Sequence, residues 1–142
     1  MTRVFIDSSV LFSAAYSITG KAHDLMQMGI AKQVVLVISD DVSTEVRRNF
    51  ALDYPDRLAM VDFFFDQSAF ETAADPTTEE VKAAAEYTAL KDAPIVAAAI
   101  KDQCTHLITY DRRHLLDRPE VAQRSRLRIV SPADMIDELA AS

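Results

Sequence analysis

Short apolar runs rich in β-branched residues alternate along this chain with segments of helical periodicity, and this alternation limits the fold more than any other feature. The clearest run is "VVLVI", Val34 to Ile38, which contains no polar position. Continuous runs of this kind are typical of strands that are buried on both faces of a parallel sheet. Similar runs extend from Val4 to Asp7, from His106 to Tyr110 and from Leu127 to Val130, and "FETAA" is a weaker candidate.

Helices are predicted between these strands. Apolar residues at i, i+3, i+4 and i+7 predict a helix over Lys21 to Ala31. Because strands that are separated by helices form right-handed βαβ units, the chain is expected to be an α/β protein. We predict a three-layer α/β/α sandwich with a mostly parallel central sheet of four to five strands. Helix-start signals occur at Asp40 or Asp41, at Thr77 with Glu80 (a capping box), at Asp92 with Pro94, and at Ser131 with Pro132.

The composition excludes several classes of protein. Hydrophobic residues make up 49% and charged residues 26% of the 142 positions, as expected for one globular domain over residues 1–142. No apolar run approaches the roughly 18 residues that span a bilayer, and the N-terminus does not resemble a secretion signal. Cys104 is the only cysteine, so neither an intrachain disulfide nor a thiolate zinc cluster is possible. We therefore expect a cytoplasmic protein without membrane association.

Four acidic residues are predicted to meet at one edge of the sheet. Asp7 ends the first strand and Asp111 follows a later one, and ligands of open parallel sheets lie beyond the carboxyl ends of the strands. Glu45 shares a helical face with Val42, so its side chain is expected to point inward. Asp92 precedes an almost wholly apolar helix.

Each of these acids also has an ordinary interpretation when it is taken alone. Asp7 could start a turn with the two serines that follow it, and Asp92 could cap its helix. Asp111 could form a surface ion pair, and the side chain of Glu45 could be solvated. Their conjunction favours a site, because two like charges about 4 Å apart repel by about 4 kcal/mol at an effective dielectric near 20. Such a cluster requires raised pKa values or bound cations, and carboxylate oxygens suit Mg²⁺ or Mn²⁺, which serve phosphodiester hydrolysis.

The same four positions carry a family resemblance. Asp7 in "VFIDSSVLFSA", Glu45 in "STEVRRN", Asp92 in "KDAPIVAAAI" and Asp111 in "LITYDRRHLL" together resemble the PIN (PilT N-terminal) domain over essentially the whole chain. The resemblance implies a Mg²⁺- or Mn²⁺-dependent ribonuclease, often the VapC-like toxin of a toxin–antitoxin pair. The four residues correspond in order to the four acids of that family. One position departs from the pattern, because many members carry a further acid where this chain has Arg113.

The resemblance also implies roles for individual residues. Asp7, Asp92 and Asp111 would hold the cation directly or through its waters. Glu45 would orient a water molecule or a second cation. Cleavage would leave 5′-phosphate and 3′-hydroxyl ends. Hydroxyl groups that hold the carboxylates in place are expected from Ser8, Ser9 and Thr109.

Partners are predicted from the charge and from the resemblance. The net charge of −7 has the wrong sign for bulk attraction to nucleic acid, so an RNA substrate would need a local basic patch or bound cations. Arg112 and Arg113 are candidate contacts to the RNA backbone, with a solvated surface as the alternative. The resemblance implies a homodimer and a small antitoxin that sends a basic side chain toward the acidic cleft. Apolar surface around Met26 and Phe63 to Phe65 could supply its groove.

Three other functions stay open from the sequence. The chain could be a housekeeping RNA-processing nuclease of the same family, or a PIN-like module that binds without cleaving. A haloacid-dehalogenase-type hydrolase with Asp7 as nucleophile would require a second acid where this chain has Ser9. The histidines His23, His106 and His114 show no metal-ligand spacing and are expected to have ordinary roles.

Overall fold

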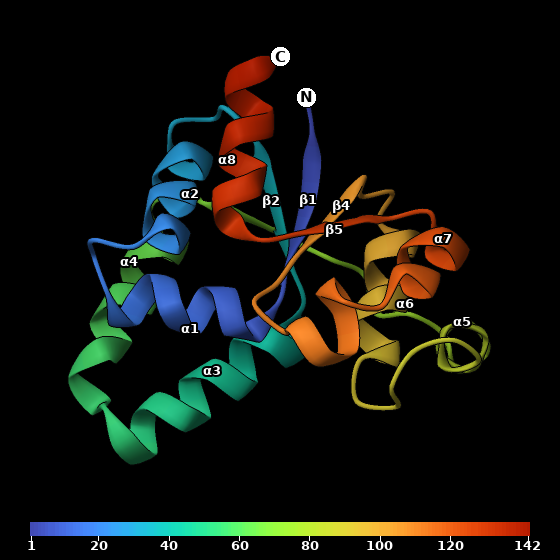
Figure 1. Cartoon of the computed structure of the whole chain (residues 1–142). Helices are drawn as coiled ribbons and strands as arrows, with labels where there is room; N and C mark the ends of the chain where they lie inside the picture. Colours follow the sequence, from blue (N-terminus) through green and yellow to red (C-terminus); the bar gives the residue numbers. More distant parts are fainter.

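Five parallel strands form the centre of the computed structural model, which describes all residues from 1 to 142 (Figure 1). The strands are β1 (Arg3–Ile6), β2 (Val35–Ile38), β3 (Phe70–Thr72), β4 (His106–Ile108) and β5 (Arg128–Val130). Their order across the sheet is β3-β2-β1-β4-β5, and every neighbouring pair is parallel. Within the sheet, Phe5 of β1 is registered with Val37 of β2 and with Leu107 of β4. Every predicted strand is therefore present, including the weak candidate at "FETAA".

Helices cover both faces of the sheet, which confirms the predicted three-layer fold (Figure 1). They are α1 (Ser8–Tyr16), α2 (Lys21–Ile30), α3 (Asp40–Asp53), α4 (Leu58–Asp66), α5 (Thr78–Ala85), α6 (Ala93–Lys101), α7 (Pro119–Ser125) and α8 (Pro132–Ala141). In Figure 1, α1, α2 and α4 lie to the left of the sheet, and α5, α6 and α7 lie to its right. None of these helices combines the length and the apolar character needed to cross a membrane.

Side-chain caps start several of the helices. The hydroxyl of Ser39 accepts a backbone N–H of the first turn of α3 at 3.2 Å, so the prediction of an Asp40 or Asp41 cap is wrong. Those two aspartates are exposed in the first turn, where their charges favour the positive end of the helix dipole. The predicted capping box of α5 and the serine cap of α8 are confirmed at Thr77 with Glu80 and at Ser131.

Helix α1 follows β1 with a single residue between them, although no helix is predicted there. Its buried side chains are those of Val10, Leu11, Ala14 and Ala15, which form a stripe along the core face. The two serines at its start resemble a turn in sequence, yet they occupy the first helical turn. As a result Asp7 stands at the N-terminus of α1, directly beyond the end of β1.

The core is one connected cluster of 34 buried apolar residues on both faces of the sheet. Gly29 of α2 packs directly against β2, because a Cβ atom on it would lie 2.8 Å from Cγ of Leu36 and 3.2 Å from the carbonyl oxygen of Ala69. Both distances lie inside van der Waals contact, so the glycine permits this close packing.

The sheet has its topological switch point next to β1. The chain continues from β1 to β2 on one side and returns later to β4 on the other side. Ligands of open α/β sheets bind at such points, beyond the carboxyl ends of the strands. Asp7 follows β1 and Asp111 lies shortly after β4, so both are brought to this position. Both termini of the chain lie at the opposite, upper end of the molecule in Figure 1.

Candidate active site

Three hydroxyl groups hold the carboxylate of Asp7 at the junction of β1 and α1. Ser8 donates to Oδ1 and Ser9 to Oδ2, each at 3.2 Å, and Oγ1 of Thr109 donates to Oδ2 at 2.5 Å. The Asp7 side chain is buried and caps no backbone N–H of α1. The hydroxyl groups thus lie where their predicted supporting role requires them, and the carboxylate is fixed on both of its oxygens.

Asp92 is the most informative residue of the site. It precedes α6 but accepts no backbone N–H, so the interpretation as a side-chain cap is wrong. The residue is only 6% exposed, and its Oδ2 is the one buried side-chain nitrogen or oxygen in the chain without a hydrogen-bond partner. A buried carboxylate oxygen without a partner costs free energy. This oxygen is therefore available to a ligand such as a cation.

Asp111 lies next to Asp92 with the ammonium group of Lys91 between them. Nζ of Lys91 lies 2.9 Å from Oδ2 of Asp111 and 3.5 Å from Oδ1 of Asp92. The other oxygen of Asp111 accepts the backbone N–H of His114 at 3.0 Å and so caps the π-helical segment Arg112–Leu116. The Lys91 side chain is 58% exposed, so its ammonium can leave the carboxylates without disturbing the core.

The two carboxylates have opposite pKa shifts. Burial raises the pKa of Asp92, and the negative charges of Asp111 and Asp7 add to this effect against the opposing charge of Lys91. Burial also acts to raise the pKa of Asp111, but hydrogen bonds from Lys91 and from the backbone of His114 outweigh it and lower the pKa. Without a bound cation, Lys91 therefore neutralises mainly Asp111 and leaves Asp92 poorly stabilised.

Glu45 is exposed, so the prediction that it points inward is wrong. The buried stripe of α3 is formed by Val42, Val46 and Phe50 at intervals of four residues, and Glu45 lies on the flank of that stripe. Its side chain nevertheless faces the same cavity as the other three acids. An exposed carboxylate at the mouth of a cavity suits a role toward water or substrate rather than toward the core.

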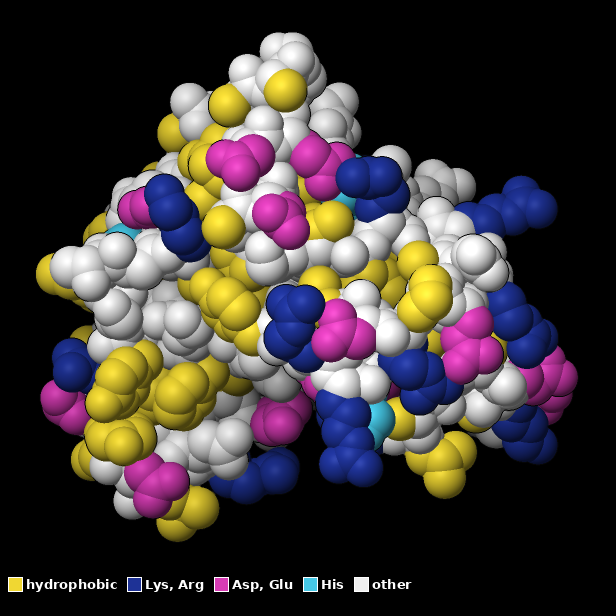
Figure 2. Space-filling view, viewed as in Figure 1, with side chains coloured by type: hydrophobic (Ala, Val, Ile, Leu, Met, Phe, Trp, Pro, Cys, Tyr) yellow, Lys and Arg dark blue, Asp and Glu magenta, His cyan; other side chains and the backbone are white.

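All four predicted acids line one cavity of about 180 Å³. Ile95 is its single apolar lining residue, so the cavity is suited to ions and polar groups. Figure 2 shows the lower edge of the molecule indented between two walls that carry acidic and basic side chains. The residues that line the cavity are Asp7, Ser8, Ser9, Glu45, Lys91, Asp92, Ile95 and Asp111.

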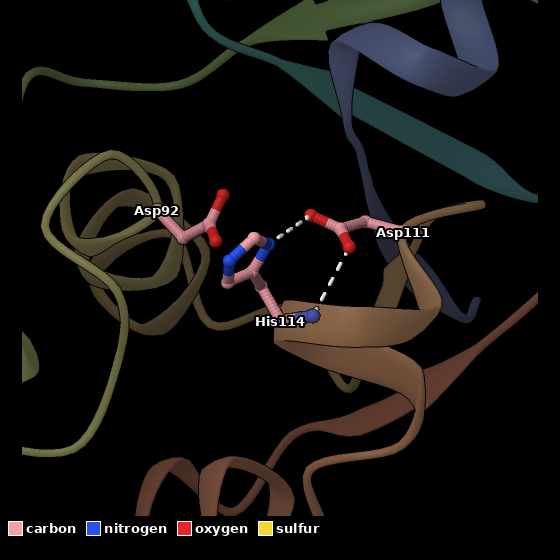
Figure 3. A group of neighbouring side chains, drawn as sticks. All are labelled: Asp92, Asp111 and His114. Carbon is pink, nitrogen blue, oxygen red and sulfur yellow. Dashed lines mark hydrogen bonds and ion pairs between the residues drawn. The ribbon is translucent and has the colours of Figure 1, made fainter.

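Two residues of the cluster had no signal in the sequence. Lys91 bridges two of the acids, and His114 lies beside Asp111 with Nδ1 3.3 Å from Oδ2 (Figure 3). One ring nitrogen of His114 and one oxygen each of Asp92 and Asp111 lie within 4.8 Å of one another. Sequence spacing could not indicate this, because the π-helical segment after Asp111 turns the histidine back toward the carboxylates.

Most of the arginines near the C-terminus are already paired with acids. Arg112 lies 3.1 Å from Asp117, whereas Arg113 forms no ion pair. The remaining ion pairs of this group are Arg118 with Glu120, Arg124 with Glu86 and Arg128 with Glu138. These contacts favour a solvated surface over a continuous basic track, and they leave Arg113 as the free basic group next to Asp111.

The apolar surface differs from the predicted groove. Met26 is fully buried and contributes no surface, so that part of the prediction is wrong. Phe64 is also fully buried, whereas Phe63 is 42% exposed. A second exposed aromatic group is formed by Tyr16 and Tyr54, whose ring centroids lie 5.1 Å apart.

Comparison with known proteins identifies the family. Residues 3–113 match the model of the PIN domain family. The chain belongs to the PIN domain family. PIN domains are in general nucleases, and they typically bind a divalent metal ion. The four acids lie together at the switch point, where the sequence resemblance expects them, and Lys91 and His114 lie beside Asp111.

Solved PIN structures share the fold over almost the full chain. PAE2754 from Pyrobaculum aerophilum is 22% identical, with a TM-score of 0.65, and the match covers 99% of this chain and 91% of that one. VapBC2 from Rickettsia felis, bound to a promoter DNA fragment, is 15% identical with a TM-score of 0.66, covering 92% and 98%. FitAcB from Neisseria gonorrhoeae is 14% identical with a TM-score of 0.60, covering 91% and 97%. No curated protein sequence matches the chain.

The residues present fit a divalent cation. Asp92 offers a buried oxygen without a hydrogen-bond partner in the protein. Asp111 offers Oδ2, whose side-chain contacts are the exposed ammonium of Lys91 and the ring of His114. Hard carboxylate oxygens of this kind are the usual ligands of Mg²⁺ and Mn²⁺. The haloacid-dehalogenase alternative is not supported, because the family match assigns the chain to the PIN domains.

Proposed function

We propose that this PIN domain is a Mg²⁺- or Mn²⁺-dependent endoribonuclease and the toxin of a type II toxin–antitoxin pair. The observation that carries the nuclease assignment is the unpartnered oxygen of Asp92, buried beside Asp111 at the switch point of the sheet. Two similar structures, VapBC2 and FitAcB, contain PIN toxins, which supports the toxin assignment. Asp7, Asp92 and Asp111 are the proposed cation ligands, and Glu45 completes the catalytic set.

Different residues of the site have different roles in phosphodiester hydrolysis. A divalent cation held by Asp7, Asp92 and Asp111 would supply the activation of water and the neutralisation of charge on the scissile phosphate. Ser8, Ser9 and Thr109 fix the carboxylate of Asp7, so the ligand geometry is set before substrate binds. Glu45, exposed at the cavity wall, orients the attacking water.

The reaction breaks the bond between phosphorus and the 3′ oxygen. The oxygen of water forms the new bond to phosphorus from the opposite side, and the leaving 3′ oxygen takes up a proton. The products are a 5′-phosphate and a 3′-hydroxyl end. The proposed contacts to the RNA backbone are Arg113, which has no acidic partner, and Arg112, which would exchange Asp117 for a phosphate.

The test is cleavage of labelled single-stranded RNA by the purified protein with EDTA, Mg²⁺ or Mn²⁺. We expect cleavage only with a divalent cation and 5′-phosphate products. Asp92→Asn should lower the rate by about 100-fold or more. Asp137→Asn removes the same charge from an exposed position on α8 and should retain the parental rate. Equal rates for the parent and Asp92→Asn would contradict the assignment, and a protein that binds RNA but never cleaves it would be the inactive module.

The proposed partners are RNA, a second copy of the chain and a small antitoxin. The acidic cavity in a chain of net charge −7 is a natural site for an arginine from such an antitoxin, because a guanidinium matches paired carboxylates. Exposed Phe63, Tyr16 and Tyr54 offer apolar surface for an amphipathic helix. An apolar patch at the lower left of Figure 2 lies where Figure 1 shows α1 above α3.

A toxin and a housekeeping nuclease differ in their effect on the host. The chain should be expressed in its native host with and without the adjacent reading frames, and then affinity-purified. A toxin arrests growth when it is expressed alone, and a small partner co-purifies and silences cleavage. Harmless expression of an active enzyme without a small partner identifies a housekeeping nuclease.

A further inference from the structure

His114 lies beside Asp92 and Asp111 at the cation site and is the only histidine of that group. Figure 3 shows its ring between the carboxylates of Asp92 and Asp111. One of its nitrogens and one oxygen of each carboxylate lie within 4.8 Å of one another. A cation with ligands at about 2.1 Å holds its donor atoms about 3 to 4 Å apart, so small side-chain rotations bring this set to ligating distances.

Local structure fixes the histidine in this place. The backbone N–H of His114 donates to Oδ1 of Asp111 at 3.0 Å, and ring Nδ1 lies 3.3 Å from Oδ2 of the same carboxylate. The side chain is 31% exposed, so it is neither locked into the core nor free in solvent. A ligand is independently indicated by Asp92, which is 6% exposed and has an unsatisfied buried oxygen.

We propose that a ring nitrogen of His114 is a ligand of the cation, together with Asp92 and Asp111, and that this makes the site prefer Mn²⁺ to Mg²⁺. The inference rests on the cation site of the proposed function and adds to it a ligand and a choice of metal. Imidazole nitrogen is a ligand of transition metals, whereas Mg²⁺ prefers oxygen alone and retains its waters. Mn²⁺ accepts both carboxylate and imidazole, so the mixed ligand set discriminates between two ions of equal charge.

Lys91 is compatible with this ligand set. Its ammonium contacts the same Oδ2 of Asp111 that the histidine faces, and its side chain is 58% exposed. A divalent ion between the carboxylates would displace it into solvent. Mn²⁺ binds a nitrogen ligand more strongly than Mg²⁺ does. Mn²⁺ therefore displaces the Lys91 ammonium more readily than Mg²⁺.

The direct test is pulsed electron paramagnetic resonance of Mn²⁺ bound to the whole chain. A coordinated imidazole gives a ¹⁴N modulation of the Mn²⁺ echo, and we expect that signal from the parent protein. It should be absent from His114→Asn, whose amide retains hydrogen bonding toward Asp111 but offers no ring nitrogen. A Mn²⁺ complex of the parent without ¹⁴N modulation would overturn the inference, and this outcome requires no variant to fold.

Equilibrium binding of each metal provides the second readout. By calorimetry or equilibrium dialysis, the parent should bind Mn²⁺ about tenfold or more tightly than Mg²⁺. His114→Asn should weaken Mn²⁺ binding by about tenfold and change Mg²⁺ binding by less than about threefold. An unchanged Mn²⁺ to Mg²⁺ ratio in His114→Asn would overturn the metal preference.

The outcome also separates this inference from the proposed function. Asp92→Asn should weaken the binding of both ions, because it removes an oxygen ligand that both require. If neither ion binds the parent at millimolar concentration, the cation site itself is absent and both proposals are wrong. If both ions bind and only the effects of His114→Asn are missing, the nuclease site stands and the histidine is not a ligand.

Discussion

A single oxygen atom, Oδ2 of Asp92, shows how the site differs from the rest of the fold. Almost every buried polar group in a folded protein has a hydrogen-bond partner, and among the buried side-chain nitrogen and oxygen atoms of this chain this oxygen is the exception. The residue could have satisfied it by capping α6, but its conformation does not direct the side chain to the helix N–H groups. The free protein thus retains an unfavourable charge that a cation would relieve.

The first prediction concerns this charge. In metal-free buffer at pH 7, Asp92→Asn should raise the melting temperature, because it removes a buried carboxylate whose pKa is raised chiefly by burial. The pKa is higher in the folded than in the unfolded state, so the parent gains stability as the pH falls through the folded pKa toward the unfolded one. The advantage of the variant should therefore shrink in melts at pH 4. A variant that melts below the parent at pH 7 would assign Asp92 a structural role.

The second prediction concerns Lys91. Lys91→Met should bind Mn²⁺ and Mg²⁺ more tightly, because the cation no longer displaces an ammonium group from Asp111. An exposed ion pair is worth about 0.2 to 1 kcal/mol, which corresponds to about a 1.4- to 5-fold gain in affinity. Lys82→Met removes an exposed, unpaired charge from α5 and should leave the affinity unchanged. Weaker cation binding by Lys91→Met in calorimetry would show that the lysine supports the site instead.

At the scale of elements, the ends of β1 and β4 are joined by one hydroxyl group. Thr109 is fully buried, donates to Asp7 Oδ2 at 2.5 Å and accepts the backbone N–H of Asp111 at 3.0 Å. The backbone N–H of Asp7 also donates to the carbonyl of Ile108 at 3.1 Å. The two acids are therefore held to each other through strand ends rather than through flexible loops.

The third prediction tests this connection. Thr109→Val keeps the shape of the side chain but removes its hydroxyl group, which binds Oδ2 of Asp7 and the backbone N–H of Asp111. The loss of both hydrogen bonds should destabilise the protein by about 1 to 3 kcal/mol. It should also weaken cation binding, because Asp7 and Asp111 lose a common anchor. Thr109→Ser retains the hydroxyl and should keep most of the stability and affinity. Urea unfolding and metal titration check both effects, and equal losses in the two variants would point to packing rather than to the hydrogen bonds.

The sequence predicted the elements better than it predicted the orientation of single side chains. Strands such as Val35–Ile38 were predictable because a short, continuous run of β-branched residues in a globular protein is typical of a strand buried on both faces of a parallel sheet. The inward orientation of Glu45 was wrong because the buried stripe of α3 follows a spacing of four, which puts i+3 on the flank. Lys91 and His114 could not be predicted, because tertiary packing and a π-helical segment decide where they point.

At the scale of the whole molecule, the site is assembled from distant parts of the sequence. Asp7 follows β1, Glu45 lies on α3, Asp92 precedes α6 and Asp111 follows β4. Like charges in a chain of net charge −7 are thus concentrated at one edge of the sheet. The stability of the entire fold is therefore linked to whatever ion binds there.

The fourth prediction follows from that linkage. At a free Mn²⁺ concentration of about 100 times the dissociation constant, the free energy of unfolding should rise by about 2.7 kcal/mol. Melting curves in EDTA and in Mn²⁺ measure the effect, and excess EDTA should reverse it. Asp92→Asn should show a much smaller rise under the same conditions. An unchanged melting temperature of the parent in millimolar Mn²⁺ would contradict the cation site.

Because β1 lies at the centre of the sheet, it can pair with both of its neighbours only late in the synthesis of the protein. β1 ends at Ile6, but its second neighbour β4 begins only at His106. A nascent or truncated chain that stops before His106 carries three of the four acids beside an unpaired strand edge, which is a template for aggregation. If the chain cleaves RNA as proposed, cleavage begins only after β4 has been synthesised and has paired with β1, because Asp111 follows β4.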